Sequence, residues 1–138
     1  MMSNKRRILV VEDQESERNA LERVLRVAQY DVLTAKSAED ALDWSDQDVD
    51  LVISDLRMGK RSGIDLLMQW REVHKETPFI LATAYGDVDS AVRAMKLGAT
   101  DYLTKPIGYE LEWVYSPDFE MVQLPCDPES AQRYLNLR

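Results

Sequence analysis

The stretch LVISDLRMGK, residues 51–60, decides how the rest of the chain is interpreted. It is apolar from Leu51 to Ile53 and then places a carboxylate, Asp55, where a buried strand would end. A short continuous apolar run of this kind is typical of a strand that is covered on both faces, as in a parallel sheet. Ligands bind outside the carboxyl ends of such strands, so a charge at this position indicates a site.

The pattern around this stretch alternates between two periodicities. Short apolar runs rich in β-branched residues are each followed by apolar residues at helical spacing, as in residues 20–28. The expected strands cover residues 7–11, 31–35, 50–54, 78–83 and 101–105, with helices between them. Ser37 with Asp40 three places later resembles a capping box, and Gly98 stands where the fourth helix would stop. The alternation predicts an α/β fold with right-handed crossovers and a parallel sheet covered on both faces.

Composition and charge limit the class of protein. The 138 residues fit one domain, and 45% hydrophobic with 30% charged residues is typical of a soluble globular protein. The net charge of -8 argues against direct nucleic-acid binding and favours protein partners. No apolar run reaches membrane-spanning length, and the run after MMSNKRR is too short for a signal peptide. A cytoplasmic protein without a membrane segment is therefore expected, and its single cysteine, Cys126, cannot form an internal disulfide.

Polar residues capable of chemistry follow four of the expected strands. Glu12 and Asp13 follow the first, Asp55 the third, Thr83 ends the fourth and Lys105 ends the fifth. Each has a simpler structural explanation, because an acid can cap a helix, a threonine can bond to backbone and a lysine can be a solvated charge. The occurrence of all of them at matched strand ends favours one shared site.

Three carboxylates at one site point to a metal ion. Held close together they repel one another, and the pKa of at least one would be raised unless a cation joined them. Hard oxygen ligands without a nearby histidine or cysteine favour Mg²⁺. A site with Mg²⁺, a lysine, a hydroxyl and a nucleophilic carboxylate has the parts needed for phosphoryl transfer, with the aspartate as acceptor.

Five motifs in order carry a resemblance to a known family: VVEDQ, SDLRM with SGIDLL downstream, LATAYG and YLTKP. Over residues 7 to about 107 the chain resembles the receiver domain of two-component response regulators, especially those of the NtrC type. The resemblance implies a flavodoxin-like, doubly wound five-stranded parallel sheet with strand order 2-1-3-4-5. It also implies a phosphorylated signalling module rather than a turnover enzyme, with a sensor histidine kinase as donor and a downstream effector domain or protein as reader.

The resemblance implies roles for the residues at the metal site. Asp55 would be the phosphoacceptor. Asp13 and Asp55 would bind Mg²⁺ together with the backbone carbonyl of Arg57, and Glu12 would complete the acidic pair.

The resemblance also implies a switch. Lys105 would pair with a phosphoryl oxygen and be followed by Pro106 in a cis peptide. Phosphorylation adds negative charge and acceptor oxygens, so the hydroxyl of Thr83 would move to the phosphate. The ring of Tyr102 would then turn inward, changing the surface around the fourth helix and fifth strand.

Two features depart from the family pattern. Met58-Gly59 stands where Met-Pro is common, so the loop loses a rigid turn and gains freedom in φ. The second departure is at the C-terminus, where the family normally continues into a fifth helix. Residues 1–107 are expected to form the receiver core, and 108–138 an atypical extension in place of that helix. Alternation in ELEWVYSPDFEMVQL predicts a β-hairpin over residues 110–124, and Asp127-Pro128 would open a short helix through Leu137.

Several alternatives remain open at this stage. The aromatic residues of the extension would either cover the core in place of a fifth helix or form a homodimer or partner surface. The whole chain would be a phosphorylatable receiver, a metal-dependent phosphohydrolase of the aspartyl-phosphate kind, or an interaction domain that has lost phosphorylation. The residues after Asp55 read LRM rather than the DxDxT pattern typical of those hydrolases, and the retained acids, threonine and lysine argue against the third alternative.

Overall fold

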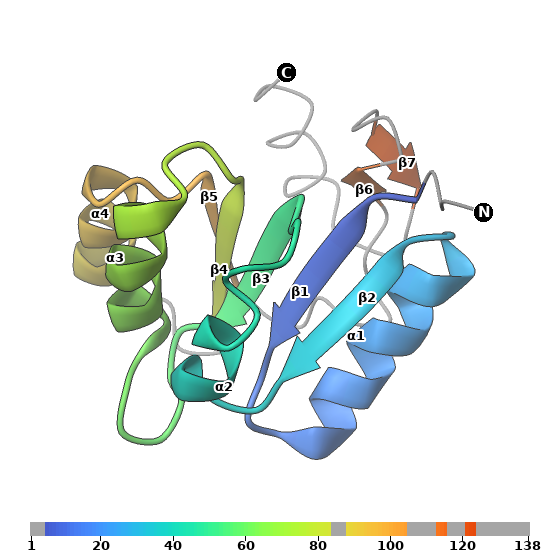
Figure 1. Cartoon of the computed structure of the whole chain (residues 1–138). Coiled ribbons are helices and arrows are strands. Elements are labelled where there is room, and N and C mark those ends of the chain that lie inside the picture. The colour runs from blue at the N-terminus through green and yellow to red at the C-terminus, as the bar shows by residue number, and fades with distance from the viewer. Residues whose placement is uncertain (1–4, 84–87, 105–112, 116–120, 124–138) are drawn as a thin grey trace.

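The computed structural model describes residues 5–83, 88–104, 113–115 and 121–123, in which strands and helices alternate as the sequence predicts (Figure 1). The elements in chain order are β1 (Arg7–Val11), α1 (Glu15–Val27), β2 (Asp31–Ala35), α2 (Ala38–Leu42), β3 (Leu51–Asp55), α3 (Gly63–Val73), β4 (Phe79–Thr83), α4 (Val88–Lys96), β5 (Asp101–Thr104), β6 (Trp113–Tyr115) and β7 (Met121–Gln123). No helix among these residues is long and apolar enough to cross a membrane.

The main sheet has the strand order β2-β1-β3-β4-β5 with all neighbours parallel, which confirms the predicted topology. The chain passes from β1 to β2 on one side and then to β3 on the other side of β1, so the order reverses between β1 and β3. Val11 at the end of β1 pairs with Ser54 of β3. The register therefore places Glu12, the next residue, level with Asp55 at the reversal point, where doubly wound sheets bind their ligands.

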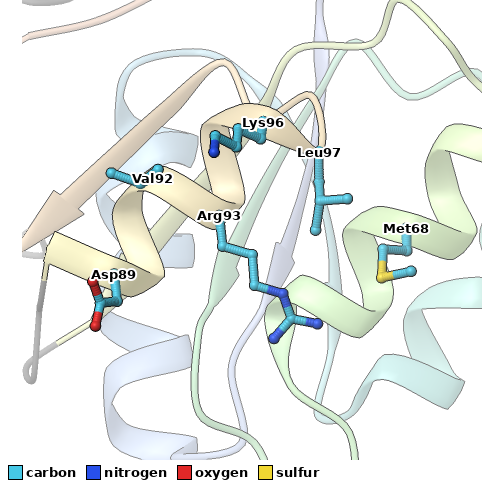
Figure 2. Close-up of a pocket in the computed structure, with 6 residues that line it drawn as sticks. All are labelled: Met68, Asp89, Val92, Arg93, Lys96 and Leu97. Atoms are coloured by element: carbon cyan, nitrogen blue, oxygen red, sulfur yellow. The ribbon is translucent and has the colours of Figure 1, made fainter.

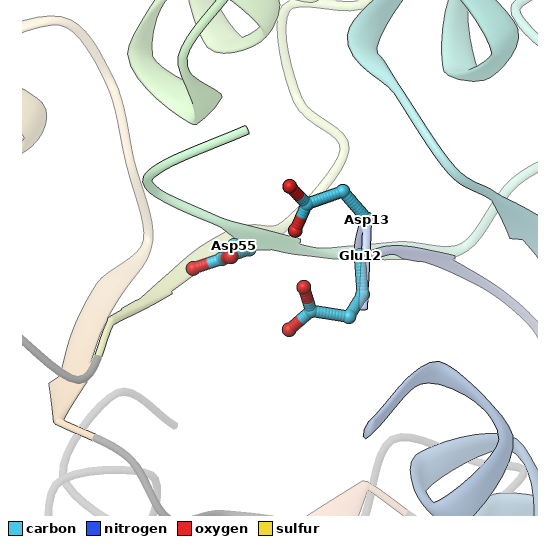
Figure 3. A group of neighbouring side chains, drawn as sticks. All are labelled: Glu12, Asp13 and Asp55. Atoms are coloured by element: carbon cyan, nitrogen blue, oxygen red, sulfur yellow. The ribbon is translucent and has the colours of Figure 1, made fainter. Parts of the chain in front are cut away.

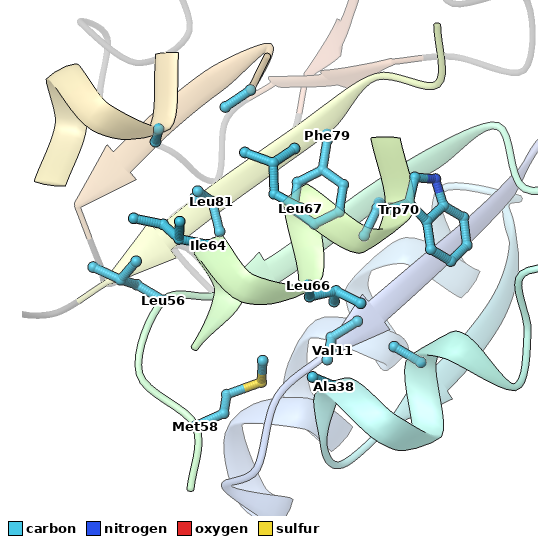
Figure 4. Close-up of a cluster of buried hydrophobic side chains, with 14 of the residues drawn as sticks. Val11, Ala38, Leu56, Met58, Ile64, Leu66, Leu67, Trp70, Phe79 and Leu81 are labelled. Atoms are coloured by element: carbon cyan, nitrogen blue, oxygen red, sulfur yellow. The ribbon is translucent and has the colours of Figure 1, made fainter. Parts of the chain in front are cut away.

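Each face of the sheet has its own hydrophobic core, and β1 contributes to both. Ile8 and Val10 lie in the cluster under α1, whereas Leu9 and Val11 lie in the cluster under α2, α3 and α4 (Figure 4). Successive side chains of a strand point to opposite faces, so a strand covered on both sides must be apolar at every position. This explains why the strand runs are continuously hydrophobic rather than alternating.

The helix ends follow the predicted signals in part. Ser37 accepts a hydrogen bond from the Asp40 N–H at 3.1 Å, but the reciprocated capping box lies at α3, between Ser62 and Asp65. Helix α2 is short and ends at Leu42. Gly98 has φ +102°, which confirms that it ends α4 through a left-handed position.

The C-terminal extension contains the predicted strand pairing. β6 and β7 pair antiparallel, with Val114 opposite Val122, which confirms a hairpin inside residues 110–124. The predicted helix through Leu137 lies outside the described residues. The domain division at residue 107 and the role of the extension stay predictions.

Arg71 of α3 ties together the carboxyl ends of two helices. Its Nε and Nη2 donate to the Gly98 carbonyl at 3.1 and 2.8 Å, and its Nη1 donates to the His74 carbonyl at 2.9 Å. Partial burial lowers the pKa of the guanidinium from its usual value. The side chain thus supplies donors to carbonyls that the helices themselves leave without partners.

Arg71→Ala should lower the free energy of unfolding by about 1–2 kcal/mol, because it removes three charge-assisted hydrogen bonds that water can only partly replace. Arg71→Lys should recover little, since an ammonium group cannot reproduce the fork of the guanidinium. Urea unfolding measures the effect. Arg23, exposed on α1, is the matched control, and equal losses in Arg71→Ala and Arg23→Ala would contradict the assignment.

Candidate functional site

Three carboxylates gather where the sheet order reverses. One oxygen from each of Glu12, Asp13 and Asp55 lies within 4.8 Å of the others (Figure 3). Glu12 is buried, Asp55 is half-buried and Asp13 is exposed. A group of hard oxygen donors with one side open to solvent suits a cation that keeps part of its water shell. The predicted clustering of these three acids is therefore observed.

The backbone after β1 is held by several hydrogen bonds. The Glu12 N–H donates to the Ala35 carbonyl at 3.0 Å, and the Arg18 guanidinium donates to the Glu12 carbonyl at 2.8 Å. The Glu12 carboxylate accepts from the Gln14 N–H at 3.1 Å. One Glu12 oxygen is thus engaged by the protein itself, whereas the Asp13 side chain is exposed to solvent.

The backbone around Asp55 is held from two sides. The Ser54 hydroxyl donates to the Asp55 carbonyl at 2.9 Å, and the Leu56 N–H extends the pairing with β4 through the Ala82 carbonyl at 2.9 Å. The Gly63 N–H at the start of α3 donates to the Leu56 carbonyl at 2.7 Å. Sequence reasoning assigned no role to Ser54 or Gly63. The Ser-x-x-Asp pattern at residues 62–65 was the available signal, because it marks where α3 must begin.

The loop from Asp55 to α3 is anchored without a proline after Met58. Met58 is buried in the core under α3, and Gly59 has φ +42°, a conformation that proline cannot adopt. Arg61 forms an ion pair with Glu39 at 3.2 Å and donates to Gln69 at 2.9 Å. Gly59 thus adopts a positive φ angle, as the expected freedom in φ at this position allows.

Thr83 lies on β4, the strand next to Asp55, and Tyr102 lies on β5, one strand further along the sheet. Asp55 pairs with Ala82, so Thr83 is one residue further toward the same edge, and its side chain is buried. Tyr102 is buried in the core cluster under α2, α3 and α4, so its ring is directed inward in this structure. Lys105 and Pro106 fall outside the described residues. The fold thus brings a hydroxyl to the edge that carries the acids.

A groove between α3 and α4 lies apart from this acidic group (Figure 2). Its volume is about 480 Å³, and it is lined by Met68, Asp89, Val92, Arg93, Lys96 and Leu97. None of these is a predicted phosphotransfer residue. Met68, Val92 and Met95 are about half exposed, at 45–47% of their full area, so α4 and its neighbour present apolar surface to solvent.

The chain matches a family model described as "Response regulator receiver domain" over residues 8–111. It is 39% identical over 100 residues to the transcriptional regulatory protein CpxR of Escherichia coli K12, a match that covers 72% of this chain and 43% of CpxR. It is 34% identical over 105 residues to the response regulator protein PilR of Pseudomonas aeruginosa, which covers 75% of this chain and 24% of PilR. The chain therefore spans less than half the length of these curated relatives.

Among solved structures, the chain is similar to a response regulator protein from Burkholderia pseudomallei, with a TM-score of 0.71 and 29% sequence identity. The match covers 74% of this chain and 61% of that chain. That structure is described as containing a phosphorylated aspartic acid, a calcium ion and citrate.

Proposed function

Because the chain belongs to the family of response regulator receiver domains, we propose that Asp55 accepts a phosphoryl group from a sensor histidine kinase. The predicted membership of the response regulator receiver family is confirmed. The observation that carries the proposal is the approach of Glu12, Asp13 and Asp55 to within 4.8 Å at the reversal point of the sheet. In the transfer, an Asp55 carboxylate oxygen forms a bond to phosphorus as the bond from phosphorus to the histidine nitrogen breaks.

The proposed cofactor is Mg²⁺. Asp13 and Asp55 would hold it together with the backbone carbonyl of Arg57, with Glu12 close by. A divalent ion offsets the mutual repulsion of the carboxylates and neutralises charge on the phosphoryl group. The similar Burkholderia protein, described with a phosphorylated aspartic acid and a calcium ion, supports a site of this kind.

The proposed switch uses the buried hydroxyl at the end of β4. Lys105, which follows β5 and precedes the proposed cis peptide at Pro106, would pair with a phosphoryl oxygen. Thr83 would donate its hydroxyl to the phosphoryl group, and the inward position of Tyr102 would be favoured. The burial of Thr83 supports its part in this proposal, because a buried threonine needs little displacement to reach the phosphoryl group at the same sheet edge. Tyr102 is already buried in this structure, so phosphorylation would stabilise a position that its ring already occupies.

The proposed output surface is α4 with β5. The exposed apolar side chains of Val92 and Met95 lie on α4, next to the cations Arg93 and Lys96, and Met68 of α3 faces them across the groove. Exposed apolar surface with a charged rim is typical of a protein interface. The reader would be an effector domain or protein, or a second copy of the chain, and the names of the relatives favour transcriptional regulation as the output. The receiver core would comprise residues 1–107, with 108–138 as its extension.

The test is direct phosphorylation of the intact chain. Incubation with acetyl phosphate or phosphoramidate and Mg²⁺ should add one phosphoryl group per molecule, measured by intact mass. Rapid multiple turnover on small phosphate esters would select the phosphohydrolase alternative instead. Absence of labelling would select an interaction domain that has lost phosphorylation.

A further inference from the structure

We propose that Gly63 and Ser54 form a socket for the backbone carbonyl of Asp55, and that this socket positions the phosphoacceptor. The inference rests on the proposed function, because it assigns a positioning role within the same site. The socket is defined by the Ser54 hydroxyl on one side and the bare Cα of Gly63 on the other.

The first wall of the socket is a hydrogen bond. Ser54 is fully buried, and its hydroxyl donates to the Asp55 carbonyl at 2.9 Å. A buried hydroxyl and a carbonyl each need a partner, and this bond serves both at once. It also fixes the orientation of the peptide that carries the Asp55 side chain.

The second wall is the close approach of α3. A Cβ added at Gly63 would lie 2.3 Å from the Asp55 carbonyl oxygen and 2.6 Å from Cδ2 of Leu81. The first contact is with backbone, which cannot rotate away, whereas the second is with the end of a flexible side chain. Glycine is therefore required by proximity here and not by its φ angle, which is the other common reason for a glycine.

The two contacts of Gly63 fix the segment that separates the proposed metal ligands. Its N–H donates to the Leu56 carbonyl at 2.7 Å, while its Cα approaches the preceding carbonyl, that of Asp55. Leu56 lies between Asp55 and Arg57, which would supply a carboxylate and a carbonyl to the ion. The capping box of Ser62 and Asp65 fixes the start of α3 and so holds Gly63 in place. A displacement of this segment would change the position of both proposed ligands together.

The experiment compares Gly63→Ala with two variants at Leu81, using acetyl phosphate and Mg²⁺. Gly63→Ala should fold with reduced stability and label about 10²-fold more slowly, since displacing a reacting group by about 1 Å has an effect of that order. Leu81→Val alone should label at the wild-type rate. In Gly63→Ala/Leu81→Val the side-chain clash is relieved but the clash with the Asp55 carbonyl stays. The double variant should therefore be more stable than Gly63→Ala, while its labelling stays as slow as that of Gly63→Ala.

A stability-matched control separates positioning from folding. Leu67→Ala removes a fully buried side chain of α3 and should destabilise the protein, yet label at the wild-type rate under folding conditions. Labelling by Gly63→Ala at the wild-type rate would overturn the proposal. So would a recovery of labelling in the double variant in step with stability.

Ser54→Ala tests the other wall and does not depend on how Gly63→Ala folds. It removes one hydroxyl without adding an atom, and it should slow labelling several-fold and raise the Mg²⁺ concentration needed for half-maximal rate. A rate and Mg²⁺ dependence equal to those of the wild type would overturn the socket. Failure of the wild-type chain to label would reject the proposed function, which makes the two failures distinguishable.

Discussion

Asp55→Asn should abolish labelling by acetyl phosphate while leaving the fold unchanged. The amide has nearly the same shape as the carboxylate but lacks the nucleophilic oxygen, so no acyl phosphate can form. The residue is half-buried at a strand end and belongs to a group of three acids. Removing one of three neighbouring negative charges relieves repulsion, so the variant should be no less stable than the wild type. Intact mass and urea unfolding measure the two effects.

The matched control is Asp48→Asn, an identical change at an exposed aspartate outside the acidic group. It should label like the wild type. Hydroxylamine should remove the phosphoryl group from the wild-type chain, because it cleaves acyl phosphates. Labelling of Asp55→Asn at the wild-type extent would contradict the assignment and place the phosphoryl group on another residue.

Asp13→Asn should weaken Mg²⁺ binding more than any other single change that keeps the nucleophile. Even partners that do not touch a metal are worth about 10–100-fold in affinity, so loss of a direct ligand should raise the half-saturating Mg²⁺ concentration by at least about tenfold. Chelation with EDTA should stop labelling of the wild type, and added Mg²⁺ should restore it. Labelling rates over a Mg²⁺ titration measure the change.

Asp13→Asn should weaken metal binding but should increase the stability of the metal-free protein. Like charges whose carboxylate oxygens lie within 4.8 Å of one another repel by about 1–3 kcal/mol at the effective dielectric constants of protein surfaces. Without metal, Asp13→Asn should therefore be more stable than the wild type. Added Mg²⁺ should reduce this difference, because the wild-type chain binds the ion more tightly and gains more stability from it.

Glu12→Gln is the informative comparison for Asp13→Asn. One Glu12 oxygen already accepts from the Gln14 N–H, and the side chain is buried. Its replacement should shift the Mg²⁺ titration less than Asp13→Asn does. A larger shift in Glu12→Gln would contradict the assignment of Asp13 as the main ligand beside Asp55.

The strands and the acids at their ends could be predicted from the residues because both depend on patterns that are local in the sequence, whereas the strand order was predicted from the family resemblance. Continuous apolar runs such as 8–11 and 51–53 identify strands covered on both faces, and the acid that follows each run falls at the carboxyl edge. Parallel pairing then brings Asp13 and Asp55 together without any knowledge of side-chain packing. The hairpin was predictable for the same reason, since alternation with period two is also local.

Only the tertiary structure decided which residues hold that edge in place. The role of Gly63 depends on the carbonyl of Asp55, eight residues earlier, and on Leu81 of β4. The hydrogen bonds of Arg71 join α3 to the Gly98 carbonyl after α4. Such contacts arise from the packing of α3 against the sheet, and no spacing in the sequence encodes their distances. The sequence by itself determined the chemistry at the strand ends through residue type and periodicity. Close packing of α3 against the strand carrying Asp55 decided where that chemistry is held. Contacts between packed elements set the positions of these atoms to within a few tenths of an ångström, and such contacts exist only in the folded chain.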